Sequence, residues 1–105
     1  MPLPTVLLAM VAAQLFDLGT FMTMIGRLGP QAEGNPIVAG LLSEGGMGAI
    51  LAAKLALIVL IGATTVVLAA RGDGRARRAW TILTGCAIVA GLFGGWSNAI
   101  TIGLG

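Results

Sequence analysis

The chain of 105 residues contains no histidine and has a single cysteine, Cys86. Histidine is the commonest metal ligand and the usual general base in catalysis. The chain therefore lacks the residue on which most metal centres and most acid–base mechanisms depend. One cysteine excludes an intrachain disulfide and any multi-cysteine metal site within one chain. Cys86, Ser43 and Ser97 also stand in no recognisable nucleophile motif. We therefore expect no enzymatic activity, no metal and no cofactor.

Charge is also scarce, because only 10% of the residues are charged while 57% are hydrophobic. Soluble domains average about a quarter charged residues. A chain this short cannot hide so much apolar surface in one globular core, since small domains leave much of their surface exposed. We expect the lipid bilayer to be its solvent. The formal net charge of +2 gives no indication of nucleic-acid binding.

Three segments meet the length of about 20 mainly apolar residues that a membrane helix needs. They cover roughly residues 5–28, 47–70 and 79–102. No positive residue precedes the first apolar run, so we expect it to be a retained span and not a cleaved signal peptide. The sequence therefore predicts an all-α integral membrane protein in which residues 1–105 form a single membrane domain.

The positive charges are concentrated between the second and third spans, in the segment RGDGRARR. We interpret this segment as a short hydrophilic turn in which Gly72 and Gly74 break the helix. The loop 29–46 has no Lys or Arg, so the positive-inside rule places the arginine segment in the cytoplasm. This predicts a multi-pass protein of the cytoplasmic membrane with a cytoplasmic N-terminus and an outer C-terminus. The arginines of the segment, which are also expected to bind anionic lipid headgroups, are Arg71, Arg75, Arg77 and Arg78.

The outer loop carries the signals of a short helix over about residues 36–44. Asn35 is a good N-cap, Pro36 suits the first helical turn, and Gly45–Gly46 would stop the helix. Its apolar residues recur at helical spacing. We therefore predict a short interfacial or re-entrant helix here.

Small residues recur every four positions in the third span, at Ala87, Gly91, Gly95, Ala99 and Gly103. Residues four apart lie on one helix face, and small side chains let two membrane helices approach closely. A shorter ridge of this kind, Gly48, Ala52 and Ala56, occurs in the second span. Packing within the chain and packing between chains both account for the ridges. Three spans seldom enclose all their polar groups, so we expect a homo-oligomer or a larger membrane protein complex.

Asp17 is an ionisable residue within the first apolar span, where a charge costs about 2.5–3.5 kcal/mol on insertion scales. Thr20 shares its helix face. At 1.5 Å per residue, Asp17 lies about 16 Å, Lys54 about 10 Å and Asn98 about 8 Å from the outer ends of their spans. The three spans are therefore expected to bring these side chains together, and Glu33 would join them if the loop folds back.

The expected cluster has two interpretations, and both stay open. In the first, Asp17 and Lys54 form a buried salt bridge that fixes helix register, so that removing one partner strands the other. In the second, the carboxylate serves a proton or ion site.

The motif Asp17-x-x-Thr20, followed by Glu33-Gly34-Asn35-Pro36 and then Lys54, resembles an uncharacterised prokaryotic family of small multi-span membrane proteins with a domain of unknown function. The likeness covers roughly residues 14–60. It implies a shared polar site built from Asp17, Thr20, Glu33, Asn35 and Lys54. It implies no activity.

A weaker likeness is to small multidrug resistance transporters, which carry an acidic residue in the first span. That resemblance implies proton exchange for cationic drugs at Asp17, with Trp96 as an aromatic wall. It departs from the family in having three spans where the family has four, and in placing Lys54 where it would repel a cation.

Three non-enzymatic functions follow from these features. The first is an oligomeric or accessory subunit of a membrane complex. The second is a small proton- or ion-coupled transporter or channel that uses Asp17 and Lys54. The third is a holin-like membrane protein, which only the size and the number of spans suggest.

Overall fold

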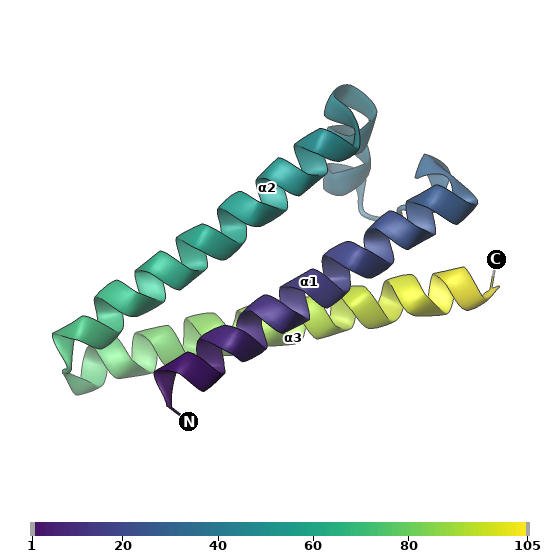
Figure 1. Ribbon diagram of the computed structural model, residues 1–105. Helices are drawn as coiled ribbons and strands as arrows, with labels where there is room; N and C mark the ends of the chain where they lie inside the picture. The colour runs from purple at the N-terminus through teal and green to yellow at the C-terminus, as the bar shows by residue number, and fades with distance from the viewer. Residues whose placement is uncertain (1, 105) are drawn as a thin grey trace.

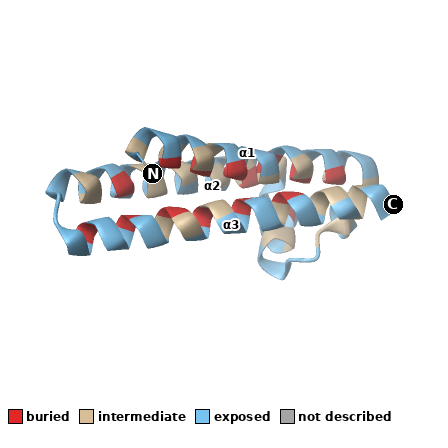
Figure 2. Ribbon diagram, turned by 90° about the horizontal axis from the view of Figure 1, so that it is seen from below, coloured by how far each residue is buried: buried red, intermediate tan, exposed pale blue. Residues whose placement is uncertain are grey.

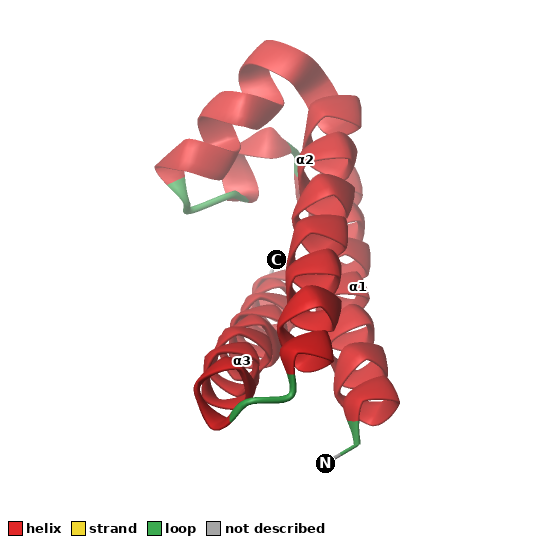
Figure 3. Ribbon diagram, turned by 90° about the vertical axis from the view of Figure 1, so that its left-hand side faces the viewer, coloured by secondary structure: helices red, strands yellow, loops and turns green. Residues whose placement is uncertain are grey.

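A computed structural model describes residues 2–104, and these form a helical hairpin with a third helix beside it (Figure 1). Helix α1 spans Leu3–Leu28, a short 3-10 helix η1 spans Pro30–Ala32, α2 spans Pro36–Arg71 and α3 spans Gly74–Leu104. Only short connections separate the helices, and Figure 3 shows no strand among the described residues. The predicted all-helical fold is confirmed.

All three long helices are long and apolar enough to cross a membrane, so the protein fits a multi-span membrane protein. Each predicted span lies within one of them. Glycines with positive φ mark the ends of the first two, Gly29 at φ 87° and Gly72 at φ 73°. Such backbone conformations favour glycine because it has no Cβ.

Helix α3 begins five residues earlier than the predicted span, so the arginine segment is mostly helical. Gly72 alone has the left-handed conformation, and Gly74 is already the first residue of α3. The prediction that both glycines break the helix is therefore wrong for Gly74. Arginine and alanine are good helix formers, and they extend the apolar helix by more than one turn beyond its hydrophobic part.

The structure does not show a separate interfacial helix over residues 36–44. Helix α2 does begin at Pro36, and the Asn35 side chain caps it by accepting hydrogen bonds from the backbone N–H groups of Ile37 at 2.9 Å and Val38 at 3.4 Å. The helix then continues into the second span, with a kink at Gly46, where φ is 72° and ψ is −169°. The non-helical backbone of Gly46 thus divides α2 into two parts that meet at the kink.

Helices α1 and α3 form the closely packed pair of the molecule. Their buried residues lie on the two facing stripes, as Figure 2 shows. At Gly91 the two backbones nearly touch, because a Cβ on this glycine would lie 2.7 Å from the carbonyl carbon and oxygen of Ala13. One turn further on, Gly95 receives the ring of Phe16. The central part of the small-residue ridge in the third span, Gly91 and Gly95, therefore serves packing within the chain, whereas a Cβ on Gly103 would meet nothing within 4 Å.

Helix α2 diverges from this pair over part of its length (Figure 1). In its most apolar 18-residue window only 11% of the residues are buried, against 33% in α1 and 28% in α3. The two parts of α2 both contact α1 around the kink, so that Leu42 before it and Ile50 after it join Leu18, Phe21 and Met24 in one apolar cluster. Helix α2 thus contacts α1 near the kink and is joined to α3 by the turn at Gly72.

Candidate functional site

Asp17 and Lys54 form an ion pair between α1 and α2. The Lys54 Nζ donates a hydrogen bond to Asp17 Oδ2 at 2.6 Å. The side chains of Lys54 and Asp17 are 18% and 23% exposed, so the pair is partly buried. Within residues 2–104 this is the only hydrogen bond that joins α2 to another long helix.

Asn98 brings α3 into the same cluster. Its amide nitrogen Nδ2 lies 3.3 Å from Asp17 Oδ1, 3.2 Å from the Asp17 carbonyl oxygen and 3.2 Å from Thr20 Oγ1. The Thr20 hydroxyl donates to the Phe16 carbonyl oxygen at 2.8 Å, which leaves its lone pairs free to accept from Asn98. The carboxylate of Asp17 is therefore held by an ammonium on one oxygen and an amide on the other. We call Asp17, Thr20, Lys54 and Asn98 the polar cluster.

The glycine pair Gly94–Gly95 makes room for this arrangement, a role that the small-residue ridge alone did not predict. A Cβ on Gly94 would collide with the carboxylate of Asp17. In the sequence, this role of Gly94 was indicated only by its position one turn before Asn98, because residues four apart lie on the same helix face.

Three residues of the polar cluster, Asp17, Lys54 and Asn98, line a cleft of about 980 Å³ between α2 and the α1–α3 pair. The side chains Phe21, Leu57 and Phe93 are among its apolar lining residues. Further polar residues line the same cleft, namely Glu33, Asn35, Ser97 and Thr101. Apolar walls with a few convergent polar groups are typical of ligand-binding clefts, and the volume lies at the upper end of their range.

Glu33 and Asn35 reach this cleft from the connection between η1 and α2. The Glu33 carboxylate accepts a hydrogen bond from the backbone N–H of Asn35 at 2.8 Å. Glu33 is half-buried and lines the cleft, but it makes no ion pair with Lys54 within residues 2–104. The lining therefore contains two carboxylates and one ammonium, and the carboxylate of Glu33 is the one without a cationic partner.

Gln14 precedes Asp17 by about one turn of α1 and links α1 to α3. Its Nε2 donates a hydrogen bond to the Ala87 carbonyl oxygen of α3 at 2.6 Å, and the residue is buried. Its Oε1 is buried without a hydrogen-bond partner in the described chain. A buried polar bond between two closely packed helices sets their register, because any slip would leave both groups unsatisfied.

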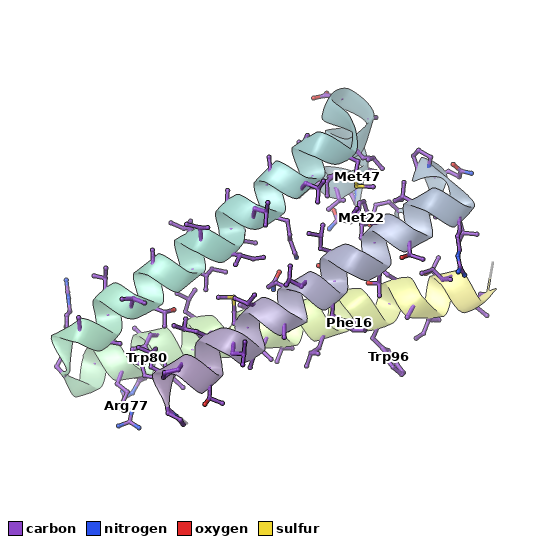
Figure 4. All side chains as sticks on the ribbon, viewed as in Figure 1. Phe16, Met22, Met47, Arg77, Trp80 and Trp96 are labelled. Atoms are coloured by element: carbon purple, nitrogen blue, oxygen red, sulfur yellow. The ribbon has the colours of Figure 1, made fainter. Side chains whose placement is uncertain are left out.

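Two groups of residues singled out in the sequence lie outside the cleft. Trp96 is 67% exposed and points away from it (Figure 4), so the expectation that it forms an aromatic wall is wrong. The arginines of the segment 71–78 lie at the opposite end of the molecule, around the Gly72 turn. We call this region the arginine end.

The cleft offers sites for a proton, an ion or the polar group of another molecule. Within residues 2–104 no three Asp, Glu, Cys or His side chains gather to hold a metal ion. Comparisons with protein-family models, with curated proteins and with solved structures find no match to this chain. The resemblance to a family of small membrane proteins of unknown function therefore stays a prediction.

Proposed function

We propose that the protein is a small polytopic membrane protein that works within a membrane assembly, formed by further copies of the chain or as an accessory subunit of a larger complex. The observation that carries this proposal is the outward face of α2. Gly48, Ala52 and Ala56 are all exposed there, and Val59 continues the same face at 68% exposure. A ridge of small residues lets a second helix approach closely in lipid.

The two small-residue ridges have different surroundings, and this difference supports the choice of α2. Gly91 and Gly95 on α3 already pack against α1, so bulky residues there would disturb the fold of a single chain. The α2 ridge faces away from the cleft, and a Cβ on Gly48 or Gly62 would meet nothing within 4 Å. A neighbouring helix can therefore use the α2 ridge without rearranging the chain.

Self-assembly is tested by the stoichiometry of the protein in lipid nanodiscs or mild detergent, measured by native mass spectrometry. We expect the wild type to form dimers or larger species. Ala56→Leu should shift it toward the monomer, because the larger side chain holds the partner helix away. Ala12→Leu is the matched control, since Ala12 is equally an exposed alanine but lies on α1.

A wild type that stays monomeric at every protein-to-lipid ratio would contradict self-assembly. The accessory-subunit alternative then requires a membrane protein that copurifies in a fixed ratio with the wild type and is lost with Ala56→Leu. Equal effects of Ala56→Leu and Ala12→Leu would contradict the α2 ridge as the contact surface in either assembly.

We further propose that the protein lies in the cytoplasmic membrane with its N-terminus in the cytoplasm. The support is the concentration of Arg71, Arg75, Arg77 and Arg78 at one end of the molecule, which the positive-inside rule assigns to the cytoplasm. Reporter fusions that are active on one side of the membrane only test this orientation. An active periplasmic-type reporter at the N-terminus would contradict it.

A second candidate function is proton- or ion-coupled transport through the cleft. It is favoured by one observation: the ion pair of Asp17 and Lys54 is accessible from a large cleft that also holds the unpaired carboxylate of Glu33. Ionisable residues within membrane spans are commonly parts of ion pathways and proton relays.

Proteoliposomes that carry a pH-sensitive dye inside test the second candidate. An imposed ion or proton gradient should drive a flux that Asp17→Asn abolishes, whereas Asn98→Ser should only reduce it. Asn98 contacts the carboxylate but carries no charge of its own. A flux that is equal in wild type, Asp17→Asn and empty liposomes would exclude coupled transport of the ions tested.

A further inference from the structure

The arginine end contains a second hollow, of about 300 Å³, which the proposed function does not use. It lies where the three helices converge, with Leu3 from α1, Leu68 from α2, and Arg77 and Trp80 from α3 among its lining residues. Leu3 and Leu68 make part of its wall apolar. Arg77 supplies the positive charge, and Asp73 also lines the hollow.

The charge of this end is strongly positive, because four of the six basic residues of the chain lie within residues 71–78 and only Asp73 opposes them. The side chain of Arg77 projects from the helix beside the start of α1 (Figure 4). Its guanidinium makes no ion pair within residues 2–104, although its backbone N–H donates to the Asp73 carbonyl oxygen at 3.0 Å. Five N–H donors of Arg77 are thus available to an anion.

Trp80 adds a second feature to the same hollow. It lies one turn along α3 from Arg77 and is only 9% exposed, so its ring is fixed by packing. Its indole N–H makes no hydrogen bond within residues 2–104. Tryptophan is enriched at the membrane interface, where its ring lies among apolar groups and its N–H bonds to headgroups.

We propose that this hollow binds one anionic phospholipid, with the headgroup phosphate on the guanidinium of Arg77 and the start of an acyl chain against Leu3 and Leu68. Arginine matches phosphate because its planar fork donates two parallel hydrogen bonds. The apolar wall distinguishes a lipid from a free phosphate ion, and the surplus of arginines favours an anionic lipid over a zwitterionic one. Arg77 is thus a site residue, whereas Arg75 and Arg78 add only to the general potential.

The experiment is native mass spectrometry of the full chain released from nanodiscs that contain phosphatidylglycerol and phosphatidylcholine in equal amounts. The wild type should retain one phosphatidylglycerol. Arg77→Gln should reduce the retained fraction by more than the roughly fivefold that corresponds to ~1 kcal/mol for one arginine near an anionic surface. Arg78→Gln is the matched control, since Arg78 is exposed on the same helix but does not line the hollow, and it should reduce retention less.

Two further measurements distinguish a lipid bound in the hollow from a free phosphate ion and from a diffuse attraction to the arginines. Inorganic phosphate at millimolar concentration should not displace the lipid, and Arg77→Lys should retain part of the binding because it keeps the charge. Equal losses with Arg77→Gln and Arg78→Gln would overturn the proposal in favour of a diffuse charge effect. Equal retention of phosphatidylcholine, or displacement by inorganic phosphate, would also overturn it.

Discussion

At the scale of single residues, Asp17 is the centre of the candidate site because each of its carboxylate oxygens has a donor from a different helix. Lys54 Nζ lies 2.6 Å from Oδ2, and Asn98 Nδ2 lies 3.3 Å from Oδ1. A charge within an apolar span is costly unless it is paired and hydrogen-bonded. The ion pair therefore lowers the free-energy cost of placing both charges in the apolar surroundings. Either charge without its partner would carry the full cost.

The first prediction concerns Asp17→Asn, Lys54→Met and their combination. Each single variant should lose roughly 3 kcal/mol of unfolding free energy, because it strands one charge in a partly buried site. The double variant should regain most of that loss, since no charge remains. Denaturation in mixed detergent micelles, followed by the fluorescence of Trp80 and Trp96, measures these differences.

The same three variants decide between the two interpretations of the ion pair. A double variant as stable as the wild type, with both single variants destabilised, identifies a structural bridge. If all three fold equally well and lose a transport activity, the structural interpretation is wrong.

At the scale of the helices, the contact between α1 and α3 depends on the absence of a side chain at Gly91. A Cβ there would meet the backbone of Ala13, which cannot move aside as the end of a flexible side chain can. The buried hydrogen bond from Gln14 to the Ala87 carbonyl oxygen lies at the same level and needs the same short separation. Close backbone approach and a polar bond thus support each other in this contact.

The second prediction is that Gly91→Ala destabilises the protein by roughly 1–3 kcal/mol, the usual cost of overpacking a tight contact. Gly85→Ala, in the same helix, is the control, because a Cβ at that position meets nothing within 4 Å. Alanine is the better helix former, so this control should be neutral or slightly stabilising. Unfolding in mixed micelles measures both, and equal stabilities would show that α1 and α3 are not in close contact at Gly91.

At the scale of the whole molecule, the protein consists of a firmly packed α1–α3 pair and a more loosely attached α2. Glycines with positive φ lie at the kink and at the turn, at Gly46 and Gly72, and the ion pair lies between them. Packing also holds α2 near the Gly72 turn, where Thr65 is fully buried, but between this end and the kink the ion pair is the only hydrogen bond within residues 2–104 that joins α2 to another long helix. The width of the cleft therefore depends on the contact between Lys54 and Asp17.

The third prediction is that Lys54→Met widens the distance distribution between α2 and α3 by several ångströms. The variant loses the only hydrogen bond that joins α2 to another long helix in the described part of the chain. Spin labels on cysteines at Leu55 and Leu92, in a Cys86→Ser background, report this distance by pulsed electron resonance. Labels at Leu15 and Leu92 provide the control for the α1–α3 pair. All three positions are about half exposed. A distribution between α2 and α3 that Lys54→Met leaves unchanged would show that packing alone holds α2.

The sequence by itself determined the class of fold and the location of the three membrane helices. Long apolar runs and scarce charge leave a short chain no other way to satisfy its backbone in lipid than to form helices. It also predicted the partners of Asp17, because the depths of Lys54 and Asn98 follow from the rise of a helix. The capping of α2 by Asn35 could also be predicted from the sequence, because it depends only on residues that are close together in the chain.

Only the tertiary structure decided which helix faces meet. Small residues on the second and third spans look alike in sequence, yet Gly91 packs against α1 while Ala56 stays exposed. The kink at Gly46 and the cleft that Glu33 lines also depend on more than local propensity. Periodicity places a residue on a helix face, whereas the rotation and separation of whole helices depend on contacts between residues far apart in the chain.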